Sequence, residues 1–81
     1  MNYSFYKDEY QLMRYAIVIE KTPNNYSAYA PDLPGCAATG ATLAEIKQQI
    51  KEAIEFHLEG LREEGLPIPE PTTLCEYVEA R

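Results

Sequence analysis

Three side chains in this sequence belong to the types that most often do chemistry in proteins: one histidine, His57, and two cysteines, Cys36 and Cys75. A catalytic histidine needs a nucleophile or a carboxylate held beside it, and the sequence fixes neither next to His57. The three residues also lack the close spacing of a metal-ligand cluster. We therefore predict no catalytic residue, no metal site and no cofactor. His57 is expected to be hydrogen-bonded in the core or at an interface, and both cysteines to be free thiols.

A second group of reactive side chains is a set of glutamates in the second half of the chain, namely Glu45, Glu52, Glu55, Glu59, Glu63 and Glu64. Two interpretations are open. The glutamates form a solvated face with some support from lysines four residues away, or they complement a basic protein partner. Phe56 falls among them and is either a lone apolar surface residue or an interface anchor. We take Glu52, Phe56 and Glu59 as candidate partner-binding residues.

A long helix is needed to position these glutamates, and Thr42–Gly65 has the pattern of one. Thr42 followed by Glu45 is typical of a capping box, while Gly65 and then Pro67 end a helix. The large apolar residues fall within an arc of roughly 140° on a helical wheel, opposite the glutamates. These residues are Leu43, Ile46, Ile50, Ala53, Ile54, Leu58 and Leu61.

The apolar face of this helix needs a surface to lie on, and three strands are predicted before it. Arg14–Lys21 is rich in β-branched and aromatic residues. Residues 22–25 have turn chemistry, so Tyr26–Ala30 is expected to return as the second strand of a hairpin. Residues 31–35 contain Pro34-Gly35, which fits the middle of a type II turn. Cys36–Thr39 is then a short third strand, and Gly40 is expected to break it.

A single helix covers only one face of such a sheet. Alternation along the first strand places Ile17 and Ile19 on the side of the helix and leaves Ala16 and Val18 on the other side. Tyr29 is expected to share this uncovered face. We predict that Ala16, Val18 and Tyr29 mediate self-association into a homodimer or a higher homo-oligomer, which would complete the core of a small domain.

The end of the chain is ambiguous. Residues 66–71 contain alternating prolines and predict a stiff, extended connector. Thr72–Ala80 favours a fourth strand beside the first, although Thr73 with Glu76 is also able to cap a short helix. With the strand, the expected fold class is α+β in the order β-β-β-α-β. It consists of a three-stranded antiparallel sheet, one long helix packed on one face, and a C-terminal strand.

Length and charge limit the classes of function. Eighty-one residues make one small domain, which we place at 13–81. Residues 1–12 are expected to form an arm that is either disordered or stacks its tyrosines on the domain. The net charge of −6 argues against direct nucleic-acid binding. The apolar residues are too scattered for a membrane span. The first residues have no signal-peptide pattern, so a cytoplasmic location is expected.

Several motifs together resemble the HicB-like antitoxin family. They are NNYSAYAPDLPGC, ATGATLAEI and AIEFHLEGLREEGLPIPEP, and the resemblance covers the chain from about Met13 to Ala80. The resemblance implies a partial RNase H-like fold and oligomerisation. It also implies a role in neutralising HicA, a small toxin that cleaves mRNA. The turn residues Asp32, Leu33 and Pro34 are added as candidate contacts to this partner.

The chain departs from many family members because it has no room for a C-terminal DNA-binding domain after the resemblance ends. We therefore expect a short, single-domain antitoxin that is not an enzyme. An RNase H-like topology also raises the alternative of a metal-dependent nuclease or a ligand-binding protein, but the first strand offers only Glu20 as a carboxylate. A stand-alone oligomeric scaffold is the remaining alternative.

Overall fold

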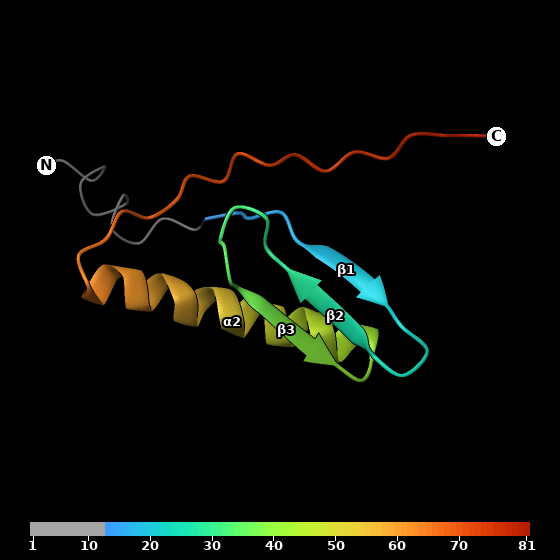
Figure 1. The fold of residues 1–81 in the computed structure, drawn as a ribbon, viewed down its shortest axis with the longest axis horizontal. Coiled ribbons are helices and arrows are strands. Elements are labelled where there is room, and N and C mark those ends of the chain that lie inside the picture. The colour runs from blue at the N-terminus through green and yellow to red at the C-terminus, as the bar shows by residue number, and fades with distance from the viewer. Residues whose placement is uncertain (1–12) are drawn as a thin grey trace, which may run out of the picture.

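The computed structural model of the protein describes residues 13–81, so the predictions made for the arm of residues 1–12 lie outside the described part. Its element order is β1 (Val18–Lys21), β2 (Tyr26–Tyr29), β3 (Ala37–Gly40) and α2 (Leu43–Glu63). The three strands form one antiparallel sheet in the order β1-β2-β3, and α2 lies across one face (Figure 1). The predicted α+β arrangement of three strands followed by one long helix is therefore confirmed.

The strands are shorter than the apolar runs that predict them, because their partners end early. In the register of the sheet, Val18 lies opposite Tyr29, and Tyr29 lies opposite Ala37. After Tyr29 the chain reaches Pro31 and turns, so residues 14–17 have no strand opposite them. The turn at 33–36 is confirmed as type II, since Gly35 has φ +83° and the Cys36 N–H donates to the Leu33 carbonyl at 3.0 Å.

Both ends of α2 have the expected caps. The Thr42 hydroxyl accepts from the Glu45 N–H at 3.1 Å, while the Glu45 carboxylate accepts from the N–H of Ala41 and not from that of Thr42. At the other end Gly65 has φ +70° and donates to the Arg62 carbonyl, and Leu66 donates to the Leu61 carbonyl. These two bonds form a Schellman motif. Local sequence therefore determines where the helix begins and ends.

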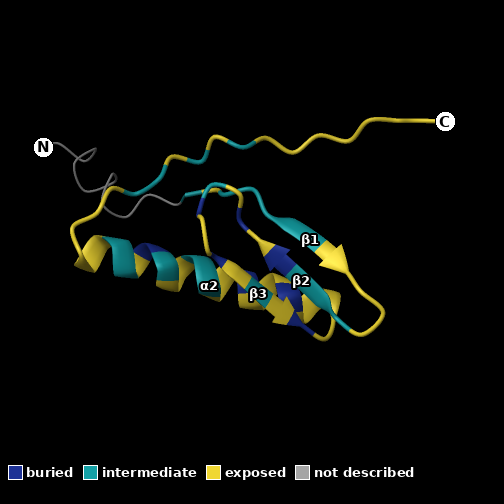
Figure 2. Ribbon diagram, viewed as in Figure 1, coloured by how far each residue is buried: buried dark blue, intermediate teal, exposed yellow. Residues whose placement is uncertain are grey.

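The core lies between α2 and the sheet in two adjoining clusters (Figure 2). One cluster contains Ala28, Ile46 and Ile50. The other contains Ala30, Leu33, Cys36 and Leu58. Gly40 was expected to break the third strand but is its last residue. A Cβ atom there would lie 2.8 Å from the Ile46 nitrogen, so the absence of a side chain lets the end of β3 approach the first turn of α2.

The expected fourth strand is not formed. Residues 66–81 contain neither helix nor strand and run past the sheet in an extended conformation (Figure 1). Tyr77 and Val78, which supplied much of the strand pattern, are 99% and 87% exposed. Strand propensity needs a partner edge, and no strand within the described chain pairs with this segment. In residues 13–81 no helix combines the length and the apolar character that a membrane span requires.

Candidate functional site

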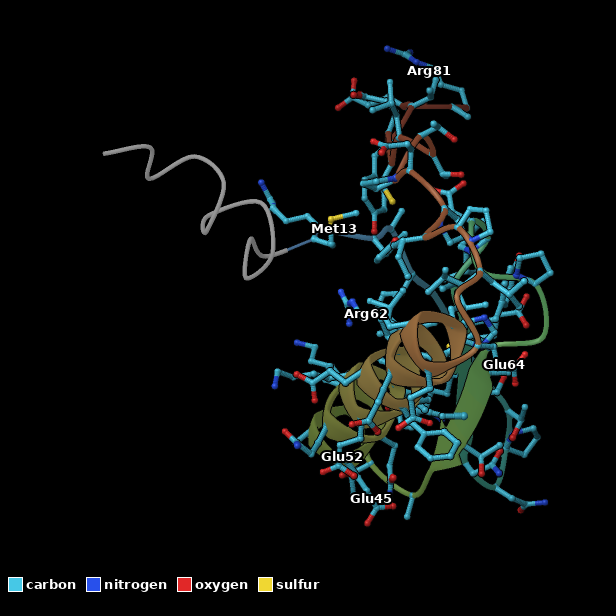
Figure 3. All side chains as sticks on the ribbon, turned by 90° about the vertical axis from the view of Figure 1, so that its left-hand side faces the viewer. Met13, Glu45, Glu52, Arg62, Glu64 and Arg81 are labelled. Carbon is cyan, nitrogen blue, oxygen red and sulfur yellow. The ribbon has the colours of Figure 1, made fainter. Side chains whose placement is uncertain are left out.

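The outward-facing side of α2 carries a continuous acidic stripe. Its members recur at helical spacing and are all exposed: Glu45, Gln49, Glu52, Phe56, Glu59 and Glu63. They point away from the sheet because the buried residues Ile46, Ile50 and Leu58 occupy the opposite side of the helix. Figure 3 shows Glu45 and Glu52 on one side of α2 and Arg62 on the opposite side. The three predicted helix contacts, Glu52, Phe56 and Glu59, thus share one surface with the other glutamates of the stripe.

Phe56 is the one large apolar side chain of the acidic stripe, and it is 78% exposed. Glu52 precedes it by one turn and Glu59 follows it by one turn, so carboxylates flank the ring on both sides. The Glu52 carboxylate accepts a hydrogen bond from the Gln48 amide at 2.8 Å, which orients it on the helix surface. An exposed aromatic ring with a charged rim has the composition of a protein-interface centre.

Phe56 also borders a groove between α2 and the turn at residues 33–36. The groove has a volume of about 440 Å³. Its lining includes Gly35, Cys36, Phe56, His57 and Gly60. The groove therefore places Phe56 near Gly35 and Cys36, which follow the predicted turn contacts, whereas the other predicted contact residues do not line it. His57 is partly buried in the wall of this groove.

The three predicted turn residues have different environments. Pro34 is exposed beside Gly35. Leu33 is 0% exposed and packs in the core, so its side chain supports the turn and is not available to a partner. The Asp32 carboxylate holds the C-terminal segment: it accepts from the N–H groups of Thr72 and Thr73, both at 2.9 Å, and from both threonine hydroxyls.

These hydrogen bonds lower the pKa of Asp32 below its ordinary value of 3.8, with the N–H of Thr73 as the main cause. A group whose pKa is lower in the folded state stabilises the fold above its unfolded pKa and loses this effect as the pH falls through the folded pKa. The tether between Asp32 and residues 72–73 is therefore expected to be intact at neutral pH and to be released only when the pH falls below the ordinary aspartate pKa, through the lowered folded-state pKa.

Replacing Asp32 with asparagine is expected to loosen the tether at pH 7, because an amide offers one acceptor oxygen in place of two. Backbone ¹⁵N relaxation of Thr72 and Thr73 should move from an order parameter of roughly 0.85 toward less than 0.6. Glu70→Gln, which removes a nearby carboxylate that makes no such bonds, serves as the control and should leave both residues rigid. Equal loosening in the two variants would show that overall charge, not the Asp32 bonds, holds the segment.

The sheet face opposite α2 is open in the described chain. Val18, Tyr29 and Ala37 lie side by side across the three strands on this face, and Tyr29 is 44% exposed. A shallow groove of about 430 Å³ follows β2 and β3 here. Ala16 precedes β1 and is partly buried. The residues predicted for self-association thus gather near one apolar surface.

Sequence reasoning missed a third groove, which lies between α2 and the residues that precede β1 and which we call the β1 groove. It has a volume of about 470 Å³. Its floor is apolar and includes Ile17, Ile50, Ile54 and Leu58, and its rim includes Arg14, Lys47, Lys51 and Arg62. The spacing of the two lysines was read only as support for Glu55, and Lys51 does bond Glu55 at 3.1 Å. Lys47 and Lys51 lie on the same side of the predicted helix, and this pattern is the signal from which the basic rim could have been predicted.

The carboxylates do not gather into a catalytic centre in the described chain. Glu20 shares the face of β1 that carries Val18, whereas α2 lies against the other face, and the acidic stripe points away from the sheet. Within residues 13–81, no three histidine, cysteine, aspartate or glutamate side chains form a group able to hold a metal ion. What the surface offers is binding: an acidic stripe with an aromatic centre, an open sheet face and a basic-rimmed groove.

Comparison with known proteins identifies the family to which this chain belongs. Residues 15–81 match the family model described as a HicB_like antitoxin of bacterial toxin-antitoxin systems. An uncharacterised 14.9 kDa protein of Haemophilus phage HP1 is 41% identical over 66 residues, which are 82% of this chain and 50% of the phage protein. A UPF0150 protein of Synechocystis sp. is 40% identical over 73% of this chain and 76% of its own length. The chain thus spans half the length of the phage relative.

Among solved structures, the chain is similar to one in a HicA3 and HicB3 toxin-antitoxin complex. The TM-score is 0.64 and the sequence identity is 41%. The match covers 73% of this chain and 69% of the solved chain. At this identity the likeness includes both the fold and much of the sequence that forms it.

Proposed function

The chain belongs to the HicB-like antitoxin family of bacterial toxin-antitoxin systems, and from this premise we propose that it binds and neutralises a HicA-type toxin. The toxin implied by the family is a small, basic ribonuclease that cleaves mRNA. The similarity to a chain of a solved HicA3 and HicB3 complex supports a partner of this kind. Because mRNA is the substrate of such a toxin, the proposal places the protein in the cytoplasm.

The observation that carries the proposed docking surface is the acidic stripe with Phe56 at its centre. An RNA-cleaving toxin needs a basic surface to hold its substrate. The glutamates of the stripe are complementary to such a surface, and opposite charges chiefly speed encounter and select the partner. Phe56 supplies apolar contact area that becomes buried on binding, and Pro34 is exposed in the turn just before Gly35, which lines the same groove as Phe56. Neutralisation is then steric and electrostatic masking of the surface that binds RNA.

This mechanism asks for no bond making by the antitoxin, so we assign it no catalytic residue and no cofactor. The net charge of −6 also disfavours direct binding to nucleic acid. The alternative of a metal-dependent nuclease derived from an RNase H-like ancestor makes a different prediction. It requires Mg²⁺- or Mn²⁺-dependent RNA cleavage by the purified protein that is lost in Glu20→Gln, and that result would replace the antitoxin proposal.

We further propose that the open sheet face takes part in self-association. Ala16, Val18 and Tyr29 give this face its apolar character, and a small domain gains stability by covering such a surface. The face lies on the side of the sheet opposite α2, so a second copy bound there leaves the acidic stripe free.

Replacing Phe56 with aspartate is expected to weaken toxin binding about 30-fold or more, the effect of losing a contact worth roughly 2 kcal/mol. The measurement is isothermal titration of a HicA-type toxin from the same genome, made inactive by mutation, together with growth rescue by the active pair. Tyr77→Asp, which changes another exposed aromatic residue, away from the stripe, is the matched control. It should bind the toxin normally.

Two outcomes would contradict the proposal at different levels. If the wild-type chain neither binds the toxin nor restores growth, the proposed function is wrong. If it binds but Phe56→Asp, shown to be folded by circular dichroism, binds equally well, the toxin docks elsewhere. Replacing Glu52 and Glu59 with glutamine tests the contribution of charge separately. We expect the association rate with the toxin to fall and to depend less on salt concentration.

A further inference from the structure

The last residues of the chain form a strand-like segment without a partner in the structure. Leu74, Tyr77 and Val78 are 86%, 99% and 87% exposed, and no hydrogen bond joins residues 74–81 to the rest of the described chain. Figure 1 shows the segment leaving the body of the protein in an extended conformation. The Cα radius of gyration is 15.2 Å, against about 12 Å for a compact chain of this length. Three large apolar side chains on such a segment predict that it is covered in the functional state.

The β1 strand offers the matching edge. It lies at one side of the sheet, so half of its backbone groups have no ladder partner. Edge strands are usually protected by charges or proline, and β1 carries charges only at its end, at Glu20 and Lys21, whereas residues 15–19 are apolar on both faces. Ile17 and Ile19 face α2, and Ala16 and Val18 face the open side. This composition is typical of a central strand, and β1 becomes central if a fourth strand is added.

The β1 groove lies between α2 and residues 13–17, which lead into β1, and it is suited to the side chains of the C-terminal segment. Its apolar floor, which includes Ile17, Ile50 and Ile54, is ready to cover apolar groups. Its rim carries Lys47, Lys51 and Arg62, together with Glu55, which is paired with Lys51. In an extended segment Leu74, Glu76 and Val78 share one face, and Cys75, Tyr77 and Glu79 share the other. Each face therefore presents two apolar residues and one glutamate, so either face matches an apolar floor with a basic rim.

The segment is directed away from its own β1 groove by the residues that precede it. The Tyr15 hydroxyl donates to the Pro69 carbonyl, and burial raises the pKa of this phenol. Asp32 then holds Thr72 and Thr73. Both contacts lie at the end of the sheet where β1 begins, and the prolines at 67, 69 and 71 stiffen the connector. A short, stiff connector that points a strand outward favours exchange with a second copy.

We propose that two copies of this chain exchange their C-terminal segments, each adding residues 74–80 of one chain as a fourth strand along the β1 edge of the other. The exchange is reciprocal, so it closes as a two-fold dimer in which the β1 edge of each chain is paired. It goes beyond toxin neutralisation, since it uses neither the acidic stripe nor a toxin. It also differs from association through the open sheet face, because it pairs the β1 edge with residues 74–80 and does not cover Tyr29.

The first test is the double substitution Tyr77→Asp with Val78→Asp, followed by sedimentation velocity over a range of concentrations. We expect the wild-type chain to dimerise and the variant to dimerise at least 100-fold more weakly. Because both side chains are almost fully exposed within one chain, the unfolding midpoint of the dilute monomer should not change. Phe56→Asp, which alters the exposed aromatic residue on α2, is the control and should dimerise as the wild type does.

The second test locates the segment. In a mixture of isotopically labelled and unlabelled chains, isotope-filtered NOEs are expected between Tyr77 of one chain and Ile17 of another. Alkylation of the exposed Cys75 thiol should slow at least tenfold as the dimer forms. A wild-type chain that stays monomeric, a dimer that persists in the double variant, or contacts from Tyr77 only to Ile17 of its own chain would each overturn the exchange. Since Phe56→Asp affects toxin binding alone, these failures are distinct from failure of the proposed function.

Discussion

Leu33→Ala is expected to destabilise the fold by about 2–5 kcal/mol, because the side chain is fully buried and its removal leaves a cavity. Domains have a total stability of roughly 5–15 kcal/mol, and small domains are toward the lower limit. The variant is therefore expected to be partly unfolded at 37 °C. Leu33 packs with Ala30, Cys36 and Leu58 beneath the turn that carries Asp32, so the tether to Thr72 and Thr73 should weaken in the folded fraction as well.

Urea unfolding followed by circular dichroism measures this effect, and Leu74→Ala is the matched control. Both substitutions remove the same atoms, but Leu74 is 86% exposed. At concentrations where the chain is monomeric the control should change stability by less than about 0.5 kcal/mol. A loss below about 1 kcal/mol for Leu33→Ala would mean that the turn is not part of the core in solution.

Gly40→Ala is expected to cost about 1–3 kcal/mol, the range for forcing extra atoms into a packed site. The new Cβ atom would lie 2.8 Å from the Ile46 nitrogen and 3.0 Å from the Ile46 Cα. Both neighbours are backbone atoms of the first turn of α2, so the helix itself has to move away from β3. Ile46 is fully buried, and this displacement would also disturb its packing against Ala28.

Gly60→Ala provides the comparison for this prediction. It introduces the same methyl group in the interior of α2, where nothing lies within 4 Å of the added Cβ. Because glycine is a poor helix former, this variant should be more stable than the wild type by roughly 0.5–1 kcal/mol. Thermal unfolding of both variants should therefore shift in opposite directions, and shifts of the same sign would refute the close contact between β3 and α2.

The parts of the fold that depend on neighbouring residues were predicted well. The helix begins after Thr42 and ends at Gly65 because its caps are local chemistry, and the turn at Pro34-Gly35 follows from the backbone preferences of two residues. The alternation in β1 correctly placed Ile17 and Ile19 against the helix. These features need no knowledge of the rest of the chain.

The parts that depend on distant residues were predicted less well. Thr72–Ala80 has the composition of a strand, but pairing requires a free edge at the right place, and the Asp32 tether directs the segment elsewhere. Leu33 was predicted to contact a partner together with its turn, although its side chain is buried under that turn. The β1 groove was missed because its floor and rim come from two segments some thirty residues apart.

The distribution of charge around α2 has a consequence for assembly. The glutamates of the acidic stripe lie on one side of α2, and Lys47, Lys51 and Arg62 lie on another. The helix therefore has one acidic side and one basic side. A positively charged partner and a negatively charged partner are attracted to separate sides of α2 and do not compete for the same site. The two proposals made above therefore use different sides of α2, the toxin the acidic stripe and the second antitoxin chain the β1 groove.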